Sequence, residues 1–115
     1  MTTTTSPVTF DAYDRSLQLL AALVPVIKQL TSLDPDEVRQ LRRAAQSVVH
    51  NIAEADGRIG KDRRHLFRLA YTSAGEVRGS LHGAVAIGTL TPELVAEPLE
   101  LLDRVRAMTY RLANK

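Results

Sequence analysis

The chain contains no cysteine and no tryptophan, and three Tyr and two Phe are its only aromatic residues. The missing cysteine excludes disulfides, thiol catalysis and cysteine-ligated zinc, and it fits a reducing compartment. Because aromatic residues are so scarce, any core must be built mainly from Leu, Val, Ile and Ala.

Long hydrophobic runs are also absent. The longest, residues 19–27, is interrupted by Pro25 and is far shorter than the ~20 residues of a membrane span. Residues 1–9 lack the basic and apolar parts of a signal peptide. We therefore expect a soluble, cytoplasmic protein without membrane contact. The net charge of +2 is weak support for nucleic-acid binding, although twelve of the fifteen basic residues are Arg, which suits phosphate and carboxylate groups.

Apolar residues at alternating three- and four-residue spacing predict four amphipathic helices, and no segment has the two-residue period of a strand. The first helix begins at Phe10, and Pro25 should kink or end it. The second begins after the cap Asp34 and ends near residue 56. The third spans about 61–87. The fourth follows the cap Thr91 and reaches about residue 113, with its start open to displacement by Pro98.

The length fits one domain. We expect an all-α, antiparallel up-down four-helix bundle over residues 10–115, preceded by a flexible arm over residues 1–9. The expected core stripes of the second and third helices are Leu41, Ala45, Val48, Ile52, Ala55, Phe67, Ala70, Ala74, Val77 and Leu81.

A polar stripe lies beside the apolar one on the second helix. Ser47, Asn51, Glu54 and Arg58 are four, three and four residues apart, so they share one helix face. If the second and third helices form a hairpin that turns near Gly60, Ser47 lies level with Ser73 and Glu76 lies near Arg43. The structural interpretation is a paired polar network that fixes the hairpin register. Its members would be Ser47, Asn51, Glu54, Ser73 and Glu76.

The functional interpretation of the same stripe is a pocket that uses Glu54 or Glu76 as an acid or base. A di-iron site is disfavoured because the chain has no Glu-x-x-His motif. We assign no catalytic residue, metal, cofactor or small-molecule substrate.

Basic residues are concentrated between positions 39 and 68, where only three acidic residues occur. Such a cluster binds phosphates by counterion release, or it is a solvated face with ion pairs. Lys61 and Arg63 oppose the macrodipole of their own helix, which favours a role beyond helix stability. No aromatic residue interleaves with these side chains, so stacking on single strands is not supported. The candidate nucleic-acid residues are Arg39, Arg42, Arg43, Arg58, Lys61, Arg63, Arg64 and Arg68.

Gly75, Gly79 and Gly83 repeat every four residues inside the third helix, each at a cost of about 1 kcal/mol relative to Ala. Such a row lets another helix approach closely. Its partner is either a helix of the same bundle or another subunit.

Two further patterns suggest a family. The segment 41–58 contains Leu-Arg-Arg-Ala-Ala, then Ser47, then Asn51-Ile52-Ala53-Glu54 and Gly57-Arg58, and the later segment 67–76 contains an aromatic residue followed by Ala-x-x-Ser-x-x-Glu. From about residue 10 to residue 90 the chain resembles the bacterial four-helix bundle proteins, also called 23S rRNA-intervening sequence proteins. Ala55 departs from the pattern, which usually has Gly, and Pro25 is also atypical.

The resemblance implies an up-down bundle that assembles into a ring-like homopentamer and has no established enzymatic activity. Some relatives are encoded within insertions in ribosomal RNA genes. Distant relatives that serve diversity-generating retroelements look like basic pentameric barrels that bind nucleic acid and a reverse transcriptase. Our leading hypothesis is a non-enzymatic oligomer that contacts structured RNA or DNA through the basic cluster. The alternative is a protein-interaction scaffold with an acidic protein partner.

Overall fold

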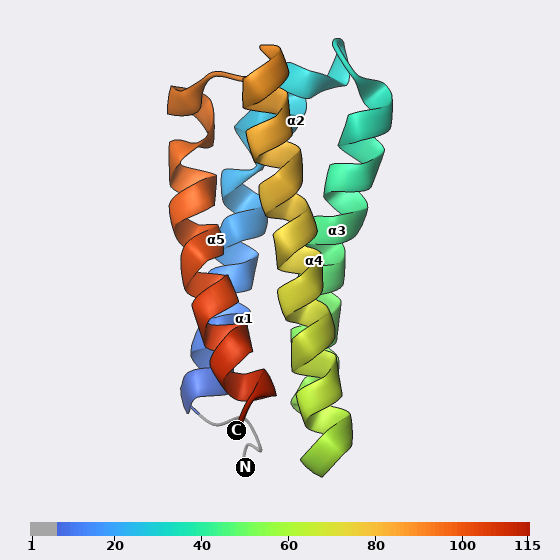
Figure 1. Cartoon of the computed structure of the whole chain (residues 1–115), viewed down its shortest axis with the longest axis vertical. Coiled ribbons are helices and arrows are strands. Elements are labelled where there is room, and N and C mark those ends of the chain that lie inside the picture. Colours follow the sequence, from blue (N-terminus) through green and yellow to red (C-terminus); the bar gives the residue numbers. More distant parts are fainter. Residues whose placement is uncertain (1–6) are drawn as a thin grey trace.

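The chain folds into an antiparallel up-down four-helix bundle measuring about 45 × 24 × 19 Å (Figure 1). The computed structural model describes residues 7–115, with side chains from residue 10 onward. Its helices are α1 (Pro7–Ala22), α2 (Val24–Thr31), α3 (Pro35–Ala55), α4 (Gly60–Ile87) and α5 (Pro92–Ala113). Most of the predicted arm, residues 1–6, lies outside the described part. Its last three residues belong to α1, which corrects the predicted boundary.

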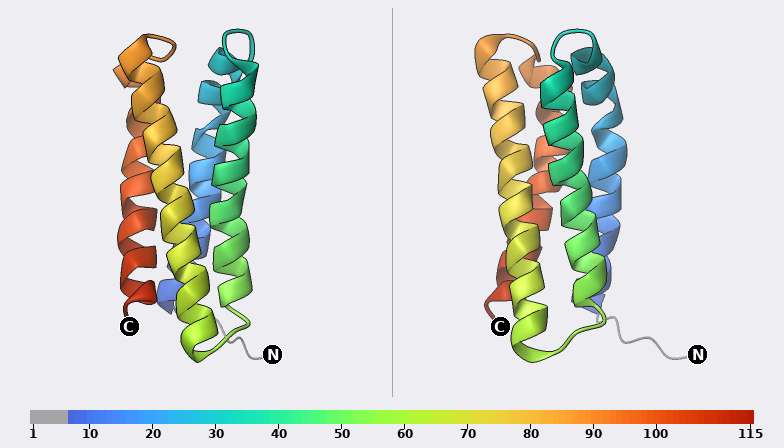
Figure 2. Two further views of the ribbon diagram at one scale, coloured as in Figure 1. Left: turned by 45° about the vertical axis from the view of Figure 1, so that its right-hand side comes forward. Right: turned by 90° about the vertical axis from the view of Figure 1, so that its right-hand side faces the viewer.

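The first rod of the bundle is divided into α1 and α2 at Leu23, as Pro25 predicted. Pro25 lies in the first turn of α2, where its missing amide has no intrahelical partner to lose. The amide of Leu23 still bonds to the carbonyl of Leu19 at 3.0 Å, and that of Ile27 bonds to the carbonyl of Leu23 at 2.8 Å. The rod therefore changes direction without leaving its place in the bundle (Figure 2).

Both predicted caps are confirmed. The Asp34 carboxylate accepts a hydrogen bond from the amide of Glu37 at 3.2 Å, and the Thr91 hydroxyl accepts one from the amide of Leu94 at 3.2 Å. Helix α5 begins directly after Thr91 and continues through the buried Pro98, so the expected displacement of its start does not occur.

The core runs along the axis of the bundle. Around that axis α1 neighbours α3 and α5, and α4 neighbours the same two helices, so α1 and α4 occupy opposite corners. All ten predicted core residues of α3 and α4 are buried, with Phe67, Leu41 and Ile52 among the largest fully buried side chains. None of the helices in the described range is long and apolar enough to cross a membrane.

The apolar stripe that predicts the first helix, positions 10, 13, 17, 20, 24 and 27, only partly faces the core. Tyr13, Leu20 and Ile27 are half-buried and pack against the core. Phe10, Leu17 and Val24 are 54%, 42% and 47% exposed. The buried positions of the rod form a second row on the other side of the helix, namely Ala12, Ser16, Leu19, Leu23, Val26 and Leu30. The first rod therefore has two apolar faces, and only one of them packs inside the bundle.

Candidate nucleic-acid interface

Helices α3 and α4 are joined by a small polar contact at mid-height. The hydroxyls of Ser47 and Ser73 share a hydrogen bond of 2.9 Å. Asn51 Nδ2 donates to the carbonyl of Ser47 at 2.8 Å and to its hydroxyl at 3.0 Å. Ser73 is buried, while Ser47 and Asn51 are half-buried. The prediction that Ser47 and Ser73 lie opposite each other is therefore confirmed. Their hydrogen bond fixes the axial register of α3 against α4.

The two glutamates of the predicted network do not belong to it. Glu54 is exposed and forms an ion pair with Arg58 at 2.8 Å, one turn further along the chain. Glu76 is also exposed. Both side chains project from the outer faces of their helices, so neither lies inside the hairpin contact. An acid or base at either position would work in open solvent.

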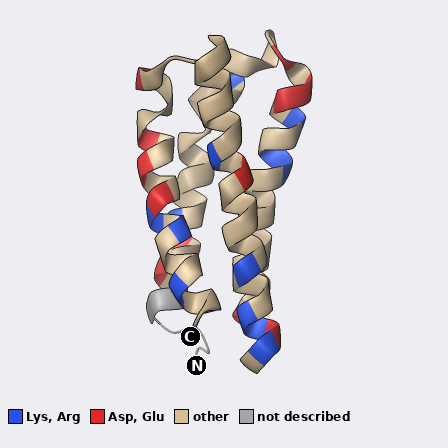
Figure 3. Ribbon diagram, in the orientation of Figure 1, with Lys and Arg blue, Asp and Glu red and all other residues tan. Residues whose placement is uncertain are grey.

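The eight candidate basic residues do not form one cluster, which corrects the sequence prediction. Arg39, Arg42 and Arg43 lie in the first turns of α3, whereas the other five surround the α3–α4 turn and the start of α4. Helix α3 has 21 residues, and at ~1.5 Å per residue its ends are roughly 30 Å apart. Arg43 lies about 18 Å along α3 from Ala55, so the first group is in the other half of the bundle from the second. Figure 3 shows the basic residues of α3 well separated from those around the α3–α4 turn.

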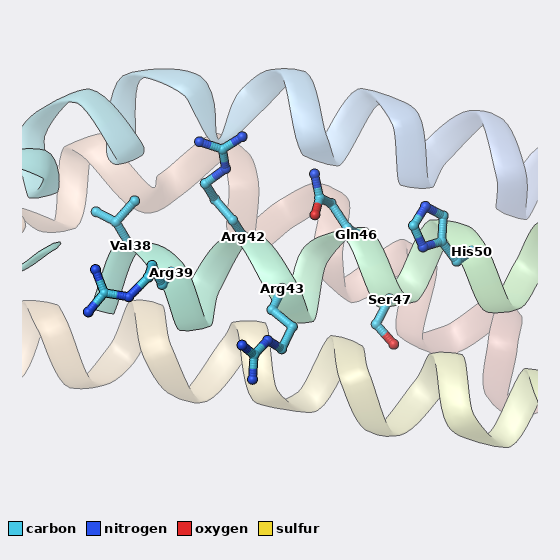
Figure 4. Close-up of a pocket in the computed structure, with 7 residues that line it drawn as sticks. All are labelled: Val38, Arg39, Arg42, Arg43, Gln46, Ser47 and His50. Atoms are coloured by element: carbon cyan, nitrogen blue, oxygen red, sulfur yellow. The ribbon is translucent and has the colours of Figure 1, made fainter. Parts of the chain in front are cut away.

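The first group borders a shallow groove of about 580 Å³ on the outer face of α3. Arg39 forms an ion pair with Asp36. In Figure 4 the side chain of Arg42 points toward the α1–α2 rod, whereas those of Arg43 and Ser47 point toward α4. Because the two guanidinium groups diverge, they do not converge on a single phosphate.

The second group contains two arginines that are engaged within the chain. Arg63 Nη1 donates to the carbonyl of Ala55 at 3.1 Å, and its guanidinium lies 5.0 Å from the centre of the buried Phe67 ring. Arg58 pairs with Glu54 and also lies 3.7 Å from the carboxylate of Asp62. Lys61 and Arg68 are exposed, and Arg64 is half-buried.

Helix α5 adds basic residues at this same end. Its acidic residues all precede position 104, and the charged residues from 104 onward are all basic, so its lower half is positive in Figure 3. We call the resulting surface the basic end of the bundle. It is defined by Arg58, Lys61, Arg63, Arg64, Arg68, Arg106 and Arg111.

Sequence reasoning overlooked the contribution of α5, although the acid-first, base-last order of residues 93–115 signalled it. The sequence pattern also predicted that no aromatic side chain lies among the basic ones. The structure shows that this prediction is wrong. The guanidinium of Arg106 lies 4.6 Å from the centre of the Tyr71 ring. The ring of Tyr110 lies 5.5 Å from that of Tyr71.

The glycine row of α4 faces outward. A Cβ atom placed at Gly79 or Gly83 would meet no atom within 4 Å, and one at Gly75 would meet only Arg106 Nη2, at 3.9 Å. Close packing inside the bundle therefore does not explain Gly79 and Gly83. The α4 small-residue stripe is Gly79, Gly83 and the exposed Ala86, an outer face with almost no side chain. Toward the start of α4 the same row continues with the exposed Glu76 and Thr72, where the stripe ends.

The α1 ridge, formed by Phe10, Leu17 and Val24, lies on the opposite corner of the bundle. Beside it a groove of about 390 Å³ runs between the first rod and α3. That groove is lined by Leu20, Leu23, Val24, Ile27, Lys28, Arg42, Ala45 and Gln46. The ridge and groove form a largely apolar surface that no other described residue covers.

No cluster of three or more His, Asp or Glu side chains suited to a metal ion occurs within residues 7–115. Glu54 and Glu76, the two residues considered as an acid or base, are both exposed.

The sequence profile of the family described as 23S rRNA-intervening sequence protein matches residues 9–111. The chain belongs to this family. Among solved structures, it is similar to a protein of unknown function from the S23 ribosomal protein family of Bacteroides thetaiotaomicron. The TM-score is 0.81 at 19% sequence identity, over 90% of this chain and 99% of the other. That similarity shows the fold. No curated protein matches the chain.

Proposed function

We propose that this member of the 23S rRNA-intervening sequence protein family is a non-enzymatic, oligomeric protein that binds structured RNA through its basic end. The observation that supports this function is the meeting of three basic segments, the α3–α4 turn, the start of α4 and the lower half of α5, at one end of the bundle. Side chains such as Lys61, Arg68 and Arg111 are exposed there. Exposed Lys and Arg side chains contact RNA phosphates by displacing counterions. Such contacts do not depend on the base sequence of the RNA.

Self-association is part of the same proposal, and two outer surfaces of the bundle support it. The α1 ridge is bulky and apolar, the α4 small-residue stripe is nearly bare, and the two lie on opposite corners of the bundle. Two different surfaces facing away from each other suit a head-to-tail contact, which closes into a ring when the rotation allows. The family resemblance implies five subunits. A ring would repeat the basic end several times and turn weak phosphate contacts into avidity.

RNA binding is tested by fluorescence anisotropy of a labelled RNA hairpin across a salt series. Lys61→Ala with Arg68→Ala removes two exposed cations at the basic end, and it should lower the slope of log K against log salt by about two. Arg42→Ala with Arg43→Ala is the matched control, since it removes the same charge from α3 outside the basic end. No binding by the wild-type protein at low salt would reject RNA and turn attention to an acidic protein partner.

Assembly is tested by light scattering after size exclusion. Leu17→Gln on the ridge and Gly83→Leu on the stripe should each reduce the oligomer, because both positions are exposed in the single chain and neither change disturbs the core. Ile59→Gln is the control, since Ile59 is 86% exposed in the α3–α4 turn and lies outside both surfaces. A wild-type chain that stays monomeric at high concentration would reject the assembly.

A further inference from the structure

Two tyrosines and an arginine meet on the α4–α5 face of the basic end. Arg106 from α5 lies over the ring of Tyr71 from α4, with its guanidinium carbon 4.6 Å from the ring centre. Tyr110, one turn after Arg106, is inclined at 55° to Tyr71 with 5.5 Å between the ring centres. The three side chains come from positions up to 39 residues apart and border an open groove of about 400 Å³.

Packing between the helices accounts for only part of this arrangement. Tyr71 is half-buried, but Tyr110 is 55% exposed, so much of its side chain faces solvent. Gly75 has no side chain to cover the guanidinium of Arg106. Within the described residues, Arg106 Nε is shielded from solvent and has no hydrogen-bond partner. The inner edge of the guanidinium is therefore covered by the Tyr71 ring on which it stacks, and the side chain also borders the open groove.

The surroundings favour a neutral, flat ligand with phosphates on either side. Asp103 also lines the groove, so a phosphate inside it would meet a carboxylate. Arg68, Tyr71, Gly75 and Arg78 follow at spacings of three, four and three, which places them on one face of α4. Arg68 and Arg78 are both exposed. The groove is thus flanked by cations along α4.

We propose that Tyr71, Arg106 and Tyr110 form a stacking site for one unpaired nucleobase of the bound RNA. Every base has a π-face, and stacking on an aromatic or guanidinium plane needs no sequence readout. The phosphates beside the base would reach Arg68 and Arg111. This inference rests on the proposed function, because it places an unpaired nucleotide of the same RNA at the same end of the bundle.

The test compares two labelled RNAs in anisotropy titrations at one salt concentration. One is a blunt duplex, and the other is the same duplex with a single bulged adenosine. Wild-type protein should bind the bulged RNA about fivefold or more tightly, the lower range for one stacked base. Tyr110→Ala should abolish that preference and leave duplex binding unchanged. Tyr110→Phe keeps the ring and should keep the preference, whereas Tyr110→Leu keeps only apolar bulk and should lose it.

The outcomes separate this inference from the proposed function. Salt-dependent duplex binding with no preference for the bulge would overturn the stacking site and leave phosphate binding in place. Equal weakening of both RNAs by Tyr110→Ala, or a preference retained by Tyr110→Leu, would also overturn it. Absence of binding to either RNA at low salt would reject both proposals. Thermal unfolding of each variant checks that the bundle is intact.

Discussion

Replacing Gly79 and Gly83 by Ala should stabilise the isolated bundle. Both residues lie in the interior of the 28-residue helix α4, and neither has a positive φ. A Cβ atom at either position would meet no atom within 4 Å, so the added methyl group neither clashes nor fills a cavity. The remaining effect is helix propensity, about 0.8–1.0 kcal/mol for each exposed Gly-to-Ala change. The double variant should gain roughly 2 kcal/mol.

Urea unfolding followed by circular dichroism measures this gain. With a slope of ~2 kcal/mol per molar urea, typical of a small domain, the midpoint should rise by about 1 M. Unfolding of an oligomer depends on protein concentration. The titration is therefore run at two concentrations, and the lower one reports the isolated chain.

Gly60→Ala is the matched control. Its Cβ atom also meets nothing within 4 Å, but Gly60 has a φ of +61°, which costs a residue with a Cβ atom roughly 1 kcal/mol or more. Gly60→Ala should therefore destabilise the bundle, although the space around its Cβ atom is as open as at Gly79 and Gly83. If Gly79→Ala and Gly83→Ala lower the midpoint of the monomer, the reasoning is refuted. If they raise it but weaken assembly, the glycines persist because a neighbouring subunit needs the bare surface.

Three further changes test local contacts by urea unfolding. Ser47→Ala and Ser73→Ala should show a coupling of ~0.5–1.5 kcal/mol in a double-mutant cycle, and additive effects would mean that their hydrogen bond does not stabilise the hairpin. Thr91→Ala should cost about 1 kcal/mol by removing the cap of α5, and no loss would show that the cap is dispensable. Arg63→Ala should cost about 1 kcal/mol while Arg68→Ala costs almost nothing, and equal effects would contradict the role of Arg63 at the turn.

The sequence predicted the helices well because apolar periodicity and caps are local properties. It could not assign the faces of the first rod. Phe10, Leu17 and Val24 follow the helical period as well as the buried row does, and they are larger than Ala12 and Ser16, which lie inside. Size and spacing therefore favoured the outer stripe. Which stripe is buried depends on the neighbouring helices, and the local pattern carries no information about them.

The sequence predicted contacts of the candidate site only between helices that are joined by a short turn. A tight α3–α4 turn sets the heights of residues equally distant from it, so Ser47 opposite Ser73 could be deduced. The prediction of a single basic cluster failed because residues close in sequence are separated along a helix. About 18 Å of α3 lies between Arg43 and Ala55, where the second basic group begins. The contact between Tyr71 and Arg106 spans 35 positions, and it forms only after α4 and α5 pair.

Arg63 shows why the charge of the basic end cannot all be attributed to a ligand. In the first turn of α4, a cation opposes the macrodipole of its own helix. The antiparallel hairpin, however, places that turn beside the carboxyl end of α3, where unsatisfied carbonyls concentrate negative charge. Arg63 donates to the carbonyl of Ala55, the last residue of α3, and stacks on Phe67. A loss of RNA binding on removing Arg63 would therefore mix phosphate contact with a loosened turn. Lys61 lies in the same turn as Arg63, and Arg68 lies between one and two turns further along α4; both are exposed. Their removal therefore reports on phosphate contact with far less effect on the fold.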